Sequence, residues 1–186
     1  MTFWKMNLSW TKKFLQDNID TVENSYRLFP SRNRWDCNVH TVYEEDTDVP
    51  KINYQFLRNK YMEASAEFAR IQGISHIFIG DVWYNYYKKS QYQEAHTHHS
   101  KWTAVHYVKF NRFKHPPTKF TDHNIKPPRV KQGDLLIFPG HYEHYVEECQ
   151  WNEPRLTIAF GISPTFLHND QWIIKNETTG QYEVAI

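Results

Sequence analysis

Residues 133–148 read GDLLIFPGHYEHYVEE, two short apolar segments separated by a turn. The Gly-Asp pair that opens the stretch predicts a turn, the four apolar residues after it predict a buried strand, and the Pro-Gly pair predicts a second turn. The following segment alternates, so His144 and Val146 share one face of a short strand while Tyr145 faces the other way. This pattern is typical of antiparallel β structure.

The same period of two recurs before and after this stretch, where we expect strands at SHIFIGDVWYNYY (75–87), TAVHYVKF (103–110) and RLTIAFGI (155–162), with a weaker pair at QWIIK and YEVAI. Upstream the period is helical. Trp10, Phe14 and Leu15 lie on one helix face behind Ser9, the expected N-cap. A longer helix is predicted over residues 52–72, before Gly73.

This order of elements predicts one domain over residues 1–186, with a helical part at 1–74 and a β core at 75–186. Short strands behind N-terminal helices are typical of a sandwich or barrel with helices on one face, and of a jelly roll in particular. We therefore expect a mostly β fold with N-terminal helices, built as a cupin-like double-stranded β-helix.

The composition excludes several classes of protein. The formal net charge is +1, from 22 basic and 21 acidic residues. This balance gives no clear nucleic-acid patch and no electrostatic sign of binding to an anionic membrane, but it does not exclude a nucleic-acid substrate. Cys37 and Cys149 stand far apart, without the spacing of a zinc ribbon or a disulfide scaffold. No segment approaches the ~20 apolar residues of a membrane span, and we expect a cytoplasmic protein.

Histidines mark a candidate metal site. His96 and His98 are two residues apart, so in an extended strand both point to one face and can reach one ion. His144 is a third candidate, and His141 stands at the turn before it. Glu94 precedes His96 by two residues and would share its face in the same strand.

The strand at 155–162 carries a lone charge. Leu156, Ile158 and Phe160 form an apolar face, suited to packing against the helices. Arg155 stands on the other face, which otherwise holds only threonine, alanine and glycine. Such a face describes a cavity with a charged group at one end, and a planar guanidinium suits bidentate capture of a carboxylate.

A second strand contributes to the same prediction. Thr103, Val105 and Tyr107 share one face of the strand at 103–110, and His106 points the other way. If the first face lines the cavity, the Tyr107 hydroxyl can bind the same carboxylate as Arg155.

Taken together, WYNYYKKSQYQEAHTHHSKWTAVHYVKF (83–110), GDLLIFPGHYEHYV and RLTIAFGI resemble the small 2-oxoglutarate–Fe(II) oxygenases of marine bacteria and their phages, distant relatives of the prolyl hydroxylases. The likeness covers about residues 82–162. It implies metal ligands and co-substrate residues in a fixed order along the chain. The implied metal ligands are His96, His98 and His144, and the residues expected around the co-substrate are Asn85, Thr103, Tyr107 and Arg155.

One position departs from the usual pattern of these enzymes. Most relatives hold the metal with two histidines and a carboxylate, the acid standing two residues after the first histidine. Here His98 occupies that place. We favour a three-histidine site of His96, His98 and His144. The alternative is that Glu94 joins His96 in place of His98.

The resemblance implies a dioxygenase that uses Fe(II), 2-oxoglutarate and dioxygen, hydroxylates a substrate and releases succinate and CO2. A protein side chain, a nucleobase and a small molecule are all open as substrate. Two other functions suit the same architecture. One is a cupin-like three-histidine dioxygenase without 2-oxoglutarate, which has no need of Arg155. The other is a non-catalytic jelly-roll binding module that uses Trp83, Tyr84 and Tyr87 as stacking surfaces.

Overall fold

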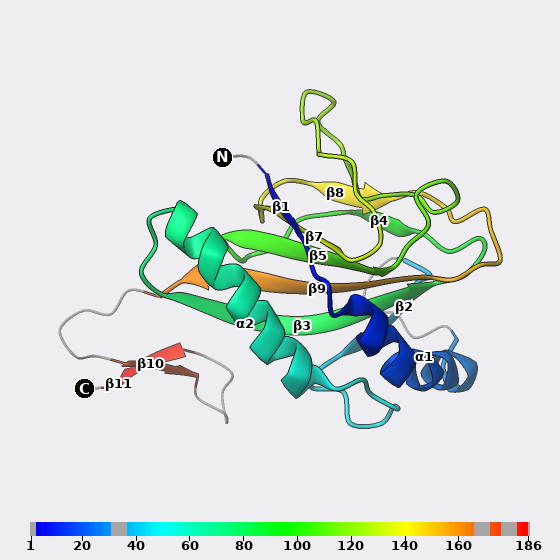
Figure 1. Ribbon diagram of the computed structural model, residues 1–186, viewed down its shortest axis with the longest axis horizontal. Helices are drawn as coiled ribbons and strands as arrows, with labels where there is room; N and C mark the ends of the chain where they lie inside the picture. Colours follow the sequence, from blue (N-terminus) through cyan, green and yellow to red (C-terminus); the bar gives the residue numbers. More distant parts are fainter. Residues whose placement is uncertain (1–2, 31–36, 166–171, 176–181, 186) are drawn as a thin grey trace.

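The computed structural model describes residues 3–30, 37–165, 172–175 and 182–185. Its largest element is a six-stranded antiparallel sheet (Figure 1). In spatial order its strands are β1 (Trp4–Asn7), β7 (Asp134–Pro139), β5 (Trp102–Lys109), β9 (Arg155–Pro164), β3 (Ile77–Tyr87) and β2 (His40–Tyr43).

A smaller sheet lies on one side of the large one. Its strands, in spatial order, are β4 (Gln93–His96), β8 (His144–Val146) and β6 (Lys119–Phe120). Residues of both sheets line one narrow cavity between them. A separate antiparallel pair consists of β10 (Trp172–Lys175) and β11 (Tyr182–Ala185), which confirms the two strands expected near the C-terminus.

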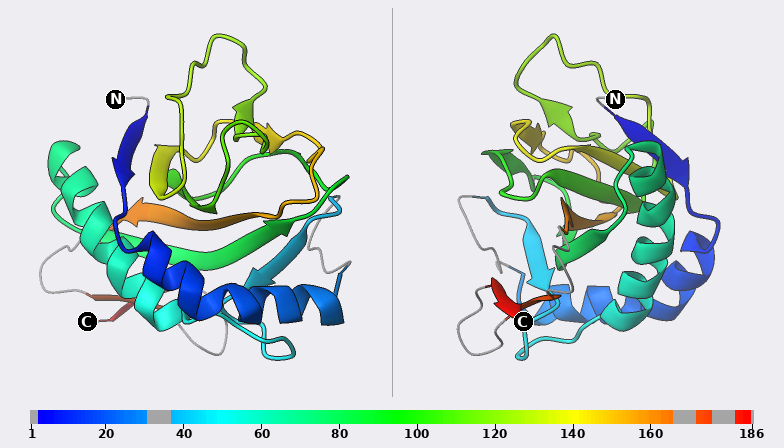
Figure 2. Two further views of the ribbon diagram at one scale, coloured as in Figure 1. Left: turned by 45° about the vertical axis from the view of Figure 1, so that its right-hand side comes forward. Right: turned by 90° about the vertical axis from the view of Figure 1, so that its left-hand side faces the viewer.

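Two helices cover the other face of the large sheet, α1 (Thr11–Leu28) and α2 (Tyr54–Ile71) (Figure 2). The α2 helix matches the predicted range, and the Asn53 side chain caps it by accepting a hydrogen bond from the Phe56 amide. For α1 the expected Ser9 cap is wrong. Trp10 holds the N-cap position, and the Thr11 amide donates instead to the Leu8 carbonyl. No helix in the described part of the chain is long and apolar enough to cross a bilayer.

Side chains of each central strand alternate between the face that packs on the helices and the face that lines the cavity. On β9, Leu156, Ile158 and Phe160 pack toward the helices, as expected, and the Phe160 ring stacks on Tyr61 of α2 at 4.3 Å between ring centroids. On β5, the alternate residues Val105 and Tyr107 belong to the cluster on the cavity side of the sheet. The fold is therefore mostly β with two helices and antiparallel sheets.

The structure differs from the predicted division at residue 75. β1 and β2 precede it, yet they form the two edges of the large sheet. Each has only four residues, too few to show a clear period in the sequence. They are strands because a distant segment pairs with them, β7 with β1 and β3 with β2. The short strand β6 went unpredicted for the same reason.

Candidate metal centre

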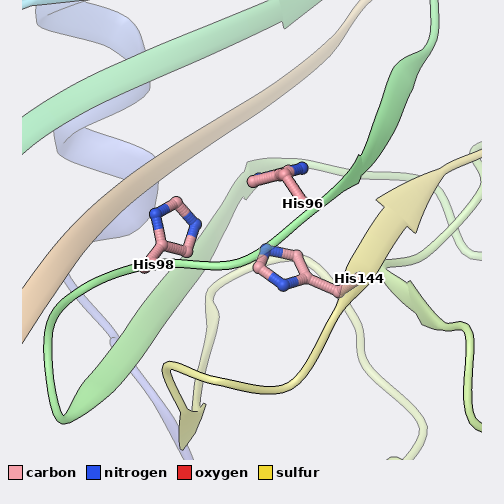
Figure 3. A group of neighbouring side chains, drawn as sticks. All are labelled: His96, His98 and His144. Atoms are coloured by element: carbon pink, nitrogen blue, oxygen red, sulfur yellow. The ribbon is translucent and has the colours of Figure 1, made fainter.

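Three histidine side chains converge at the inner end of the small sheet (Figure 3). His96 ends β4, His98 lies in the loop two residues beyond, and His144 begins β8. One ring nitrogen from each lies within 4.8 Å of those of the other two. Among the described residues this is the one group of three or more histidine, cysteine or acidic side chains that is close enough to share a metal ion.

Strand pairing and a tight turn bring the three together. β4 and β8 are antiparallel, and His96 lies directly opposite His144. The loop that carries His98 is held by its own amide, which donates to the Gly140 carbonyl at 2.9 Å. A Cβ atom on Gly140 would lie 2.0 Å from the Ser100 carbonyl oxygen, so only glycine lets the two loops approach this closely.

A β-bulge decides which side chains of β4 face the metal centre. Gln93 pairs with Val146 and His96 with His144, which leaves two residues of β4 opposite Tyr145 alone. Gln93 and His96, three residues apart, therefore both line the cavity. The expectation that Glu94 shares the face of His96 is wrong, because the bulge breaks the period of two. Glu94 is exposed and lies outside the histidine group. His141, at the turn, is likewise exposed and outside it.

Hydrogen bonds assign the tautomers of two of the rings. The Nδ1 atom of His96 lies 2.7 Å from the Glu94 carbonyl oxygen, and that of His144 lies 2.8 Å from the Tyr142 carbonyl oxygen. A carbonyl oxygen only accepts, so both Nδ1 atoms carry the proton. Nε2 is then the ring atom that carries the lone pair a metal ion needs, and each ring is oriented by its second nitrogen.

Burial keeps the three rings neutral. It lowers the pKa of His98 to about 4, together with the neighbouring His96 and His99. Burial and the nearby His96 and His98 lower the pKa of His144 to about 3. Burial also lowers the pKa of His96, against the opposing effect of its bond to the Glu94 carbonyl. Three unprotonated imidazoles at neutral pH form a ligand set ready for a transition metal.

The narrow cavity between the sheets runs from the histidines to Arg155. It is lined by His96, His98, His144, Trp83, Asn85, Tyr87, Gln93, Val105, Thr118, Val146, Arg155, Thr157 and Ala159. The Arg155 guanidinium packs on the Tyr87 ring, 4.4 Å from its centroid. Its side chain makes a long hydrogen bond of 3.5 Å from an Nη atom to Thr157 and interacts with the Tyr87 hydroxyl, while Nε has no partner. Arg155 is nevertheless 1% exposed.

The other predicted co-substrate residues lie differently with respect to the cavity. Asn85 lines it, and its side-chain oxygen accepts a hydrogen bond from Thr41 at 2.8 Å, which orients the amide. The Tyr107 ring lies beside the Arg155 guanidinium, but its hydroxyl donates to Thr118 at 2.9 Å. Thr103 is fully buried and is not among the residues that line the cavity.

Several lining residues were missed in the sequence. Gln93 accepts a hydrogen bond from the Tyr87 hydroxyl, which orders the wall behind Arg155. Thr118 follows Pro116 and Pro117 in the segment between β5 and β6, where no period assigns it a face. Only the bulge in β4 explains Gln93, and only the pairing of β3 with β9 places Tyr87 opposite Arg155.

A wider groove opens on the outer side of the metal centre, with a volume of roughly 570 Å³. Trp83 and His98 line both the groove and the cavity, so the two meet at the histidines. The Trp83 ring stacks on Tyr43, with 5.4 Å between centroids and 20° between planes, and lies 5.3 Å from the His98 ring.

Comparison with known proteins identifies solved structures that share this architecture. No protein-family model and no curated protein matches the sequence. Solved structures do match the fold. The viral collagen prolyl hydroxylase of Paramecium bursaria Chlorella virus-1, in complex with 2-oxoglutarate, has a TM-score of 0.63 at 14% identity and covers 89% of this chain and 97% of its own. The fold is that of 2-oxoglutarate–Fe(II) oxygenases.

Two bacterial proteins show the same likeness of fold. A member of the 2-oxoglutarate–Fe(II) oxygenase family from Burkholderia pseudomallei has a TM-score of 0.62 at 12% identity, covering 87% of this chain and 84% of its own. HygX from Streptomyces hygroscopicus, with nickel and 2-oxoglutarate bound, has a TM-score of 0.59 at 12% identity, covering 98% and 93%.

Proposed function

We propose that this protein is an Fe(II)- and 2-oxoglutarate-dependent dioxygenase on a double-stranded β-helix, with His96, His98 and His144 as the metal ligands. When bound, the iron and its co-substrate supply the oxidising chemistry that hydroxylates a C–H bond and releases succinate and CO2. The observation that carries the proposal is Arg155, a buried cation that forms no ion pair with a described acidic residue and lies in the same cavity as three clustered imidazoles.

A buried guanidinium without a carboxylate partner is costly, because desolvation of a charge is offset only by pairing and hydrogen bonding. No ion pair joins Arg155 to an acidic residue in the described part of the chain. Its Nε and remaining N–H groups therefore require an anion inside the cavity. A ligand carboxylate meets that need through two parallel hydrogen bonds.

The separation of the two ends of the cavity along the strands suits a five-carbon dicarboxylate, although the lining side chains must move apart to admit it, because the free volume is about 10 Å³. On the paired strands β3 and β9, Trp83, whose ring contacts His98, lies opposite Ala159, and Tyr87 lies opposite Arg155. Four residues, or about 13 Å of strand, therefore separate the Trp83 end of the cavity from the Arg155 backbone. The Arg155 side chain reaches back toward the histidines as far as Thr157. About 6–7 Å is then left between guanidinium and metal centre, the span of 2-oxoglutarate.

The ligand set fits a divalent transition metal. Imidazole nitrogens suit iron, and three ligands grouped on one side leave positions for a chelating co-substrate. Three neutral rings give the site a higher net charge than two rings and a carboxylate. A bound 2-oxoglutarate dianion offsets that charge. Asn85 is placed to hold the co-substrate along the cavity wall, while Tyr107 supports the guanidinium with its ring.

Anaerobic titration tests the proposal. Fe(II) added to the protein with 2-oxoglutarate should produce the weak visible charge-transfer absorption of the chelate, and either component alone should not. Arg155→Leu should weaken 2-oxoglutarate binding roughly 30-fold or more, because a buried charge-assisted contact is lost. Metal binding should be nearly unchanged in that variant.

Matched controls separate the site from general damage. Arg112→Leu removes an exposed arginine and should leave 2-oxoglutarate binding unaltered. His144→Ala should abolish tight metal binding, while His141→Ala, three residues away and exposed, should not. Metal binding with unaltered 2-oxoglutarate affinity in Arg155→Leu would favour a three-histidine dioxygenase without this co-substrate. Absence of metal binding in the wild type would favour a binding module.

A further inference from the structure

The β3 strand holds one residue more than its partner where it passes the groove. Ile79 and Val82, three residues apart, both pack in the core on the helix side of the sheet. In a regular strand, residues three apart face opposite ways. β9 has a single residue, Gly161, between their two pairing partners, so Gly80 and Asp81 together oppose it. This is a β-bulge, a feature that re-aims a side chain.

The bulge determines where the Asp81 carboxylate lies. In an unbulged strand Asp81 would share the face of Ile79 and point under the helices. In the structure Asp81 is exposed and lines the groove beside the metal centre. One extra residue has moved a charge from the helix side of the sheet to the groove.

An arginine on the helix side binds the bulge without pairing with this carboxylate. Arg58 of α2 donates to the carbonyl oxygens of Ile79 at 2.8 Å and Gly80 at 3.3 Å, and it forms an ion pair with Glu44. Asp81 has no ion pair and no hydrogen bond to any residue in the described ranges. Its charge is therefore available to a ligand.

The rest of the groove complements a cation. Of the described residues that line it, Asp81 is the only aspartate, glutamate, lysine or arginine. The stacked rings of Tyr43 and Trp83 form an aromatic wall, and the negative face of an aromatic ring attracts cations. An anionic ligand would meet like charge at Asp81 without a lysine or arginine in the described lining to compensate.

We propose that the substrate of this oxygenase is an organic cation, whose ammonium or guanidinium group pairs with Asp81 while its hydrocarbon part lies along the wall of Tyr43 and Trp83. This rests on the proposed function for the chemistry at the histidines. Asp81 precedes Trp83 by two residues, roughly 6–7 Å of strand, and Trp83 contacts His98.

A pair of probes that differ in charge but not in shape tests this. Choline carries a quaternary ammonium group, and 3,3-dimethylbutan-1-ol has a carbon in place of the nitrogen. Neither trimethylated centre has a lone pair for a metal. Binding would be measured by ligand-observed NMR on protein with Ni(II) and 2-oxoglutarate and on metal-free protein. Choline should bind about tenfold more tightly than the alcohol.

Variants assign the preference to one carboxylate. Asp81→Asn keeps the shape and removes the charge, so the preference for choline should fall to the smaller part that the aromatic rings supply. Asp81→Glu should restore most of the preference for choline. Asp20→Asn removes an exposed carboxylate on α1 and should leave the preference unchanged.

The outcomes separate this inference from the function on which it rests. A preference for choline that is as large in Asp81→Asn as in the wild type overturns the assignment, as does a wild type that binds both probes equally or binds neither. Failure of the protein to bind Fe(II) and 2-oxoglutarate, with the choline preference intact and dependent on Asp81, overturns the oxygenase and leaves a cation-binding groove.

Discussion

At the scale of single residues, the third position of the histidine group is the most informative. Most enzymes of this fold have a carboxylate where His98 stands. The structure places the His98 ring 5.1 Å from His144 and 5.0 Å from His96, centroid to centroid. It places Glu94 outside the group, on the exposed side of the β4 bulge.

Substitution at both positions tests the assignment. His98→Ala should weaken Co(II) or Ni(II) binding about tenfold or more, since loss of even an outer-shell partner costs 10- to 100-fold. Glu94→Ala should change nothing. His98→Asp should still bind metal, because it rebuilds two histidines and a carboxylate. Calorimetric titration of the three variants measures this. Loss of metal in Glu94→Ala with retention in His98→Ala would reverse the ligand assignment.

At the scale of elements, alternation predicted most of the central strands but not their irregularities. β3, β5, β7 and β9 are long enough for a period of two to be read, and the predicted helix at 52–72 is α2. From β9 the period assigned Arg155 to the cavity side correctly. The irregularities in β3, β4 and β5 were invisible, because a bulge is defined by the partner strand and not by its own residues.

The same limit explains the errors at the site. The period of two predicts that Glu94 and His96 share a face, but the bulge in β4 places Glu94 away from the metal centre. Thr103 shares a face with Val105 in the sequence, yet only Val105 lines the cavity. Whether a residue at the right face reaches a cavity depends on how far along the strand the opposite sheet extends, and that is a property of tertiary packing.

Arg58 is the element-scale support of the groove. Its side chain joins α2 to the carbonyl groups of the β3 bulge and to Glu44. Arg58→Met keeps the aliphatic stem but leaves those carbonyls without their partner, and should cost about 1–2 kcal/mol in the free energy of unfolding. The choline preference should also fall, because Asp81 is no longer held in place. Urea unfolding and probe binding would measure both effects.

A matched variant distinguishes this from a general loss of charge. Arg27→Met removes an arginine in the last turn of α1 whose one described hydrogen bond is a long contact to Asn24. It should change the free energy of unfolding by less than about 0.5 kcal/mol. Equal effects of the two substitutions, or an intact choline preference in Arg58→Met, would show that Arg58 does not position Asp81.

At the scale of the whole molecule, buried neutral histidines make folding depend on pH. His106 is fully buried between the Thr11 and Tyr61 hydroxyls, each 2.8 Å from a ring nitrogen. Burial lowers its pKa to about 3 from the ordinary 6.5. Between these values the unfolded chain binds a proton that the folded chain does not, so stability rises with pH across this window.

Metal-free protein should therefore lose stability as the pH falls from about 6.5 toward 3, by up to ~1.4 kcal/mol per pH unit for each such histidine. His144 and His98 act in the same direction. Urea unfolding at several pH values gives the slope, and His106→Gln should be less stable at pH 7 but show a shallower slope. A slope that is the same in this variant would mean that His106 does not titrate as proposed.

The bulge in β3 also determines where this strand tolerates the loss of a residue. Everywhere else in the strand, a one-residue insertion or deletion would exchange the helix-facing and cavity-facing side chains. At Gly80 and Asp81 two residues already share the place of one. Deleting either would leave the alternation on both sides undisturbed, from Ile79 backward and from Val82 onward. Deletion of Asp81 would remove the carboxylate from the groove, whereas deletion of Gly80 would retain it. Deletion of the Asp81 codon would therefore change the ligand preference without changing the packing of the core.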